Sequence, residues 1–134
     1  MSAASTTEFS GYLQCLNASG EVLWGSGAKS TGDIANFYTD SDGAFNIYAF
    51  AAKIALVSGS NLTALAMANK YDLNGNNLWD PAGVLLSPYP ILFEGGGGFA
   101  ANDEGSIVSW GDTRYGKKSI FLQKVVDLYY TNGN

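Results

Sequence analysis

The sequence predicts an all-β protein made of antiparallel strands, arranged in four-stranded units of about 50 residues. Turn signals that contain Gly, Asn or Asp recur about every ten residues, and the runs between them are rich in β-branched and aromatic residues. Charged residues make up only 14% of the 134 residues, whereas the chain has 17 Gly, 8 Tyr, 7 Phe and 3 Trp. This composition favours a β-rich extracellular protein over a cytosolic enzyme.

The first half of the chain is expected to form a series of short strands. Residues 1–7 are small and polar, which is typical of a flexible arm, and residues 8–134 are expected to form a single β domain. Strands are expected at residues 8–16, 21–24, 34–38, 45–56 and 62–73, with a loop rich in Gly and Ser at residues 25–32.

Alanines dominate two of these segments. In the strand at 62–73, Ala64, Ala66 and Ala68 share one face, and such a small face would let another sheet approach closely. The alanines at 49–55 also suit a helix by propensity, but their flanking β-branched and aromatic residues favour a strand. We therefore expect a strand there as well.

The best-defined element of the second half is a hairpin. Its strands are expected at residues 106–110 and 119–126, joined by a polar turn at residues 111–118. Within this turn, Asp112 and Arg114 are close enough in sequence to pair. We expect an exposed ion pair of little energetic worth.

Two connections precede this hairpin. A short strand at 78–79 is followed by a connection with prolines at 80–89, and the four glycines at 95–98 are expected to form a flexible loop or bulge. A phosphate-binding loop would need a following helix and usually a lysine, and neither signal follows these glycines.

The chain also contains an internal similarity. The segments that begin at residues 14 and 69 share a polar turn followed by Leu-Trp, so that Trp24 and Trp79 lie 55 positions apart. Lys70 and Lys124 lie 54 positions apart in a further copy of the same pattern. We therefore expect about two repeat units, at residues 14–68 and 69–126, with a recurrence of hairpin turns by chance as the alternative.

The second unit resembles the β-propeller-type repeats of secreted bacterial proteins. The similarity is best over residues 69–126 and weaker over 14–68, where the Asp-x-Arg turn is missing. The residues that carry it are Asp72, Asn74, Gly75, Asn76, Leu78, Trp79, Pro81, Gly83, Val84, Trp110, Gly111, Asp112, Arg114 and Gly116, with the strands around them. The resemblance implies an extracellular, repeat-built β protein, and it implies no activity because propellers host enzymes, lectins and scaffolds alike.

Two units are too few to close a propeller, which needs four or more blades. The chain is then a fragment of a larger propeller adhesin or enzyme, an assembly of copies, or a β-sandwich, which is the alternative fold. Unpaired strand edges recruit other chains, so we expect a homo-oligomer or polymer.

Several functional classes are disfavoured by composition. The chain has no His, which excludes Ser-His-Asp and Cys-His mechanisms, and its single Cys15 is expected to be a small buried side chain. The net charge of −5 and the scattered Lys and Arg residues argue against nucleic-acid binding. No apolar run is long enough to span a membrane as a helix. Asp103, Glu104 and Asp112 are carboxylates close in sequence, but no feature of the sequence sets them up as a glycosidase pair, and we expect no enzyme activity.

Two kinds of binding site remain as candidates. Trp79, Trp110 and Tyr115 could stack on sugar rings, although packing is the favoured role of the two Trp residues. Oxygen ligands at alternate positions suggest calcium loops, with plain hairpin turns as the favoured alternative. The candidate calcium ligands are Asp40, Asp42, Asp72 and Asn74. No other cofactor is expected.

These observations together predict a non-enzymatic protein at the cell surface or outside the cell. It would be a filament or multimeric scaffold that assembles through strand edges and contacts between units. A lectin-like module that binds carbohydrate is the alternative.

Overall fold

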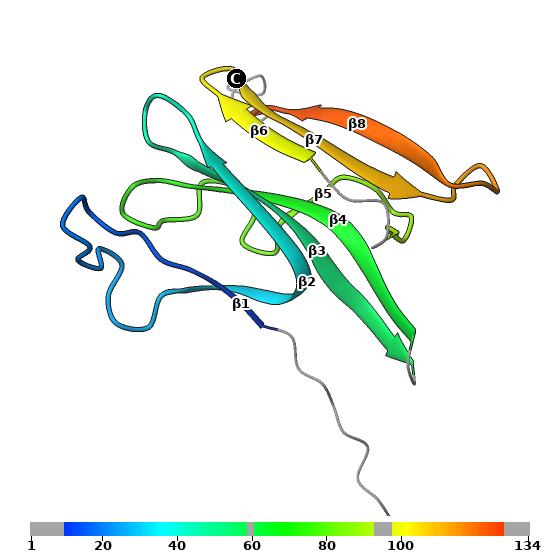
Figure 1. Cartoon of the computed structure of the whole chain (residues 1–134), viewed down its shortest axis with the longest axis horizontal. Helices are drawn as coiled ribbons and strands as arrows, with labels where there is room; N and C mark the ends of the chain where they lie inside the picture. The colour runs from blue at the N-terminus through cyan, green and yellow to red at the C-terminus, as the bar shows by residue number, and fades with distance from the viewer. Residues whose placement is uncertain (1–9, 59–60, 93–97, 128–134) are drawn as a thin grey trace, which may run out of the picture.

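The computed structural model describes residues 10–58, 61–92 and 98–127, and this part of the chain is all-β without a helix (Figure 1). The fold class predicted from the sequence is confirmed at this level. The expected arm at 1–7 lies outside the described residues, as do three of the four glycines at 95–98. No helix in the described part is long and apolar enough to cross a membrane.

Five strands form the larger sheet, in the order β1-β2-β3-β4-β5. They are β1 (Ser10–Leu13), β2 (Lys29–Ser41), β3 (Ile47–Ser58), β4 (Asn61–Tyr71) and β5 (Val84–Leu85). Every neighbouring pair is antiparallel, and β2 to β5 form a four-stranded unit.

Three strands form the second sheet, in the order β6-β7-β8. They are β6 (Gly98–Asn102), β7 (Gly105–Asp112) and β8 (Ser119–Val125). Both pairs are antiparallel, and the hairpin predicted around residues 111–118 is β7-β8. This sheet lies above the β3-β4 part of the larger sheet in Figure 1.

Some local expectations needed correction. The alanines at 49–55 lie in β3, so the helical alternative is wrong. β2 begins at Lys29, inside the predicted loop at 25–32, because β1 pairs with this segment. The return segment expected at 21–24 forms only an isolated bridge between Leu16 and Val22, and the one expected at 78–79 is not a strand, with an isolated bridge between Tyr71 and Asn77 just before it.

The main core lies between the two sheets and depends on the small face of β4. Ala64, Ala66 and Ala68 are buried, as their alternation predicts. Ala66 and Ala68 belong to one hydrophobic cluster with side chains of the other sheet, Val108 and Trp110 among them. Because alanine adds little height to the sheet, the large Trp110 side chain fits between the layers.

Two carboxylates link the sheets outside this core. Asp40 of β2 accepts a hydrogen bond from the backbone N–H of Ala101 in β6, at 2.7 Å. Asp103, in the β6-β7 turn, accepts one from the N–H of Gly43 in the β2-β3 turn, at 2.6 Å. Both links join residues about 60 positions apart, so they orient one hairpin against the other.

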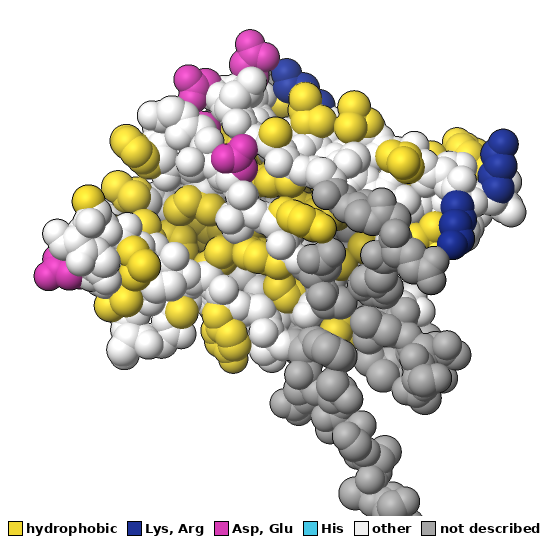
Figure 2. Space-filling model, viewed as in Figure 1, with side chains coloured by type: hydrophobic (Ala, Val, Ile, Leu, Met, Phe, Trp, Pro, Cys, Tyr) yellow, Lys and Arg dark blue, Asp and Glu magenta, His cyan; other side chains and the backbone are white. Residues whose placement is uncertain are grey.

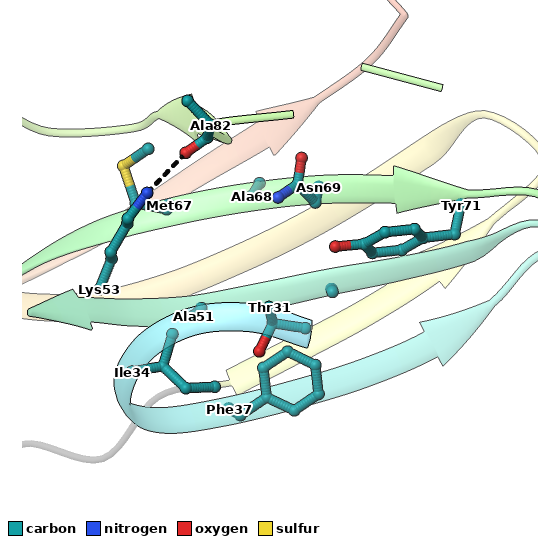
Figure 3. Close-up of a pocket in the computed structure, with 11 residues that line it drawn as sticks. Thr31, Ile34, Phe37, Ala51, Lys53, Met67, Ala68, Asn69, Tyr71 and Ala82 are labelled. Carbon is teal, nitrogen blue, oxygen red and sulfur yellow. Dashed lines mark hydrogen bonds between the residues drawn. The ribbon is translucent and has the colours of Figure 1, made fainter. Parts of the chain in front are cut away.

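A small cavity lies on the face of the larger sheet that is turned toward the curled start of β2. Figure 3 shows Ile34, Phe37 and Thr31 on one side of it and Met67 on the other. Lys53 lies at the edge of the cavity, and its ammonium donates a hydrogen bond to the carbonyl oxygen of Ala82 at 3.1 Å. The cavity holds about 20 Å³, which is room for one water molecule and not for an organic ligand.

Candidate functional site

The end of β7 carries a buried carboxylate. Asp112 is 0% exposed and accepts hydrogen bonds from the Arg114 guanidinium, from the backbone N–H of Arg114 and from the indole N–H of Trp110. Arg114 also donates to the hydroxyl of Ser87 at 2.9 Å. The hydrogen bonds from Arg114 hold the pKa of Asp112 below its usual value of 3.8, although burial opposes this shift. The expected exposed ion pair is therefore wrong, because the Asp112 carboxylate is buried beside Trp110 and the Arg114 side chain is only 20% exposed.

Aromatic rings surround the other partner of this pair. The Arg114 guanidinium lies 3.8 Å from the ring centroid of Phe121 and 4.9 Å from that of Tyr89. Tyr115 follows at the tip of the turn, 5.9 Å from Phe121 between ring centroids, and its residue is 73% exposed. Of the three predicted sugar-contact residues, Tyr115 is the exposed one. Its neighbours present an aromatic and cationic surface of the kind that sugars and anions contact.

The two predicted Trp residues lie elsewhere. Trp110 is buried in the core between the sheets, so it has no face available to a ligand. Trp79 is half-buried and donates its indole N–H to Asp127 at 2.6 Å. The structure therefore does not bring Trp79, Trp110 and Tyr115 into one site.

Asp127 also binds a buried lysine. The ammonium of Lys70 lies 2.7 Å from the Asp127 carboxylate and 5.0 Å from the ring centroid of Tyr48. Burial alone would lower the pKa of Lys70, but its hydrogen bonds to Asp127 and Tyr48 outweigh this, and the net pKa is raised. Tyr48 packs edge-on against Trp79 at 5.8 Å. This cluster attaches the end of β8 to the end of β4.

A groove of about 440 Å³ opens beside Trp79. It lies between the connection from β4 to β5 and the end of β8. Its lining is apolar apart from one carboxylate and consists of Leu78, Trp79, Asp80, Pro81, Val84, Val125 and Val126. This volume lies within the range of ligand sites, so the groove is a candidate binding site.

Three of the candidate calcium ligands, Asp42, Asp72 and Asn74, take part in turn hydrogen bonds. Asp42 accepts hydrogen bonds from the backbone of Ala44 and Asn46 and from the Asn46 side chain. Burial would raise the pKa of Asp42, but these hydrogen bonds outweigh it and the pKa is lowered. Asp72 makes the same set of bonds to the backbone of residues 74 and 76 and to the side chain of Asn76.

No three His, Cys, Asp or Glu side chains within residues 10–58, 61–92 and 98–127 gather as metal ligands. Asp40 is engaged by Ala101, as described above, and Asn74 contributes its backbone N–H, not a ligand oxygen, to Asp72. The hydrogen bonds at these positions therefore account for the turns, because the carboxylates already accept from backbone N–H groups.

The carboxylates of Asp103, Glu104 and Asp112, which are close in sequence, bind different partners. Asp103 accepts from Gly43, Glu104 lies 3.4 Å from the ammonium of Lys124, and Asp112 is bound by Arg114. Each of them has its own partner.

The outer face of the second sheet is an apolar surface that the sequence did not predict. On β8, Ile120 is 78% exposed and Leu122 is 73% exposed, and Ile107 of β7 adds a third apolar side chain beside them. Figure 2 shows hydrophobic side chains at the surface over β7 and β8. No described strand pairs with the outer edge of β8. The alternate positions of Ile120 and Leu122 along β8 indicate that the two side chains share one face of the sheet. The alternation does not say whether that face meets the core.

The chain matches none of the protein-family models, curated proteins or solved structures with which it was compared.

Proposed function

We propose that this protein is a non-enzymatic structural module that self-associates through β8 and the outer face of the β6-β7-β8 sheet. The observation that carries the proposal is that Ile120 and Leu122 are 78% and 73% exposed on an edge strand. Edge strands with apolar side chains and free backbone groups pair readily with other chains. Covering both side chains would contribute about 3 kcal/mol or more to an interface.

A comparison of the two sheets supports this proposal. In the larger sheet, β3 and β4 pair Phe50 with Ala68, and both are buried beneath the second sheet. In the second sheet, β7 and β8 pair Ser109 with Leu122 in the corresponding position, when Lys124 is aligned with Lys70. The corresponding face is therefore covered in one sheet and bare in the other. A second copy that stacks on the bare face would complete the same layering.

We propose further that the two units are stacked repeats of the propeller type and that the protein acts outside the cell, as a filament or scaffold. The similar turns at 17–21 and 72–76 support a repeat. Repeat units bury their hydrophobic faces by stacking on neighbours, so a unit with a bare apolar face is a natural point of assembly.

The test is the mass of the protein in solution. Light scattering over a concentration series, with electron microscopy of the same sample, should show oligomers or polymers that grow with concentration. The double substitution Ile120→Lys and Leu122→Lys should shift the distribution toward smaller species. Leu73→Lys is the matched control, since Leu73 is also exposed but lies on the turn at 72–76. A monomer at every concentration would refute the proposal, and so would a double variant that assembles like the native chain.

A second candidate function is carbohydrate binding at Tyr115. The observation in its favour is an exposed tyrosine at a turn tip, next to Phe121 and Arg114. Aromatic faces of this kind stack on sugar rings, and the guanidinium can face hydroxyl groups. Retention on immobilised glycans should be lost with Tyr115→Ala and kept with Tyr12→Ala, which removes another exposed tyrosine, on β1. Absence of retention for the native chain would exclude this function.

A further inference from the structure

One contact inside the molecule joins a tryptophan to a hairpin turn. Trp24 donates its indole N–H to the carbonyl oxygen of Leu73 at 2.7 Å. Its ring lies over Gly75, where an added Cβ would come within 3.0 Å of the indole. Gly75 has φ +81°, so glycine satisfies both the turn and the close approach of the ring.

A second turn has the same construction. Gly20 donates to the carbonyl oxygen of Asn17 at 2.9 Å, as Gly75 donates to that of Asp72 at 3.0 Å. The φ angle of Gly20 is +82°. Apart from Gly20 and its two chain neighbours, no atom in the described part of the chain lies within 4 Å of the Cβ position of Gly20, the place that Trp24 covers at Gly75. The turn at 17–21 is thus a turn of the same type without a covering ring.

The groove beside Trp79 is the surface that would receive such an uncovered turn. Trp79 occupies the position 55 residues after Trp24, and Leu78 donates to the carbonyl oxygen of Lys70 as Leu23 donates to that of Cys15. The groove has an apolar floor and about 440 Å³ of space. A compact turn flanked by apolar side chains suits such a site, because the turn satisfies its own backbone hydrogen bonds before it is buried.

We propose that the Trp79 groove of one copy binds the turn at residues 17–21 of a second copy of this chain. Gly20 of the second copy would approach the Trp79 ring, and its exposed Leu16 and Val22 would meet the apolar lining of the groove. Between molecules, the approach of the ring to a glycine repeats what Trp24 and Gly75 make within one, while the indole N–H of Trp79 stays bonded to Asp127. It rests on the proposed self-association but uses surfaces separate from the face of β8 that carries Ile120 and Leu122.

The geometry of this contact sets the form of the assembly. The turn and the groove are different surfaces of one chain, so the contact is head-to-tail and produces a ring or an open filament. Glu21 of the turn and Asp80 of the groove are both acidic, and the net charge of each copy is −5. Repulsion between copies is screened by salt, so association should strengthen as ionic strength rises.

Two substitutions test the two halves separately. Gly20→Asn keeps a residue that tolerates the left-handed conformation but adds a side chain where the ring must approach. Leu78→Glu puts a charge into the groove at a position that is already exposed. Leu85→Glu is the matched control, because Leu85 is exposed on β5 but does not line the groove.

The experiment measures association by sedimentation velocity in the Ile120→Lys, Leu122→Lys background, in which contacts through β8 are removed. We expect Gly20→Asn and Leu78→Glu each to weaken the remaining association about tenfold or more, and Leu85→Glu to leave it unchanged. Mixing the Gly20→Asn and Leu78→Glu chains should give one-to-one dimers that grow no further, since one intact turn and one intact groove remain. Far-ultraviolet circular dichroism checks that each variant is folded.

Other outcomes overturn the inference. Equal association of Gly20→Asn and the background chain would do so, as would a mixture that forms no dimers. If association appears only after residues 128–134 are deleted, the occupant of the groove is the end of the same chain and not a second copy. Failure of the β8 substitutions to change assembly, with complementation in the mixture intact, would refute the β8 interface and leave the turn-and-groove contact standing.

Discussion

Replacing Asp112 with alanine should destabilise the fold far more than its place in a surface turn suggests. The substitution removes the acceptor for the Arg114 guanidinium, for the indole N–H of Trp110 and for one backbone N–H. Removing one partner from a buried ion pair costs about 3–5 kcal/mol. The Arg114 side chain is 20% exposed and keeps the Ser87 hydroxyl, so water can solvate it in part. We therefore expect a loss near the lower end, about 3 kcal/mol, or a fall in Tm of about 10 °C.

Urea unfolding followed by tryptophan fluorescence would measure this loss, provided that the slope of the transition stays constant. The matched control is Glu104→Ala, which breaks the exposed pair with Lys124. That pair is 3.4 Å apart, with side chains 78% and 52% exposed, and should contribute less than about 0.5 kcal/mol. If Asp112→Ala costs no more than Glu104→Ala, the reasoning from burial is wrong.

Two further predictions concern the turns and the response to acid. Gly75→Ala and Gly20→Ala both place a side chain on a residue with a positive φ, but only Gly75 lies under Trp24. Gly75→Ala should therefore lower the free energy of unfolding in urea by about 1 kcal/mol more than Gly20→Ala does. Equal losses would show that the Trp24 contact contributes nothing. The lowered pKa values of Asp112 and Asp42 stabilise the fold above the usual aspartate value of 3.8, and this stability is lost as pH falls through their lower folded values. The free energy of unfolding should therefore drop below about pH 4, and less steeply in Asp112→Asn, whereas an unchanged slope would contradict the assignment.

Local chemistry in the sequence determined the strands and the turns. The alternation of Ala64, Ala66 and Ala68 predicted a small face, and these residues are buried, because side chains on a strand alternate between the two faces of its sheet. The turns at Asp42 and Asp72 were also predictable. Their carboxylates bind backbone N–H groups two and four residues later, so no distant partner is needed.

The sequence did not predict the contacts that join distant segments of the chain. Lys70 and Asp127 lie 57 positions apart, and the hydroxyl of Ser87 reaches Arg114 over 27 positions. The hydrogen bond between Ser87 and Arg114 brings a distant segment to the Asp112–Arg114 pair, which is why the expectation of an exposed pair failed. The start of β2 at Lys29 likewise depends on pairing with β1, which overrides the weak strand preference of a Gly- and Ser-rich segment.

Of the candidate sites, one was predictable from the sequence and two depend on the tertiary structure. That Tyr115 is exposed at a turn tip was a property of the turn sequence itself. The groove beside Trp79 and the bare face with Ile120 and Leu122 exist only because the second sheet packs on β4 through one of its faces and leaves the other in solvent. By itself the sequence determined which residues form strands and which side chains share a face. Only the tertiary structure decided which face meets the core, because that choice depends on the summed burial of both sheets and not on any single strand.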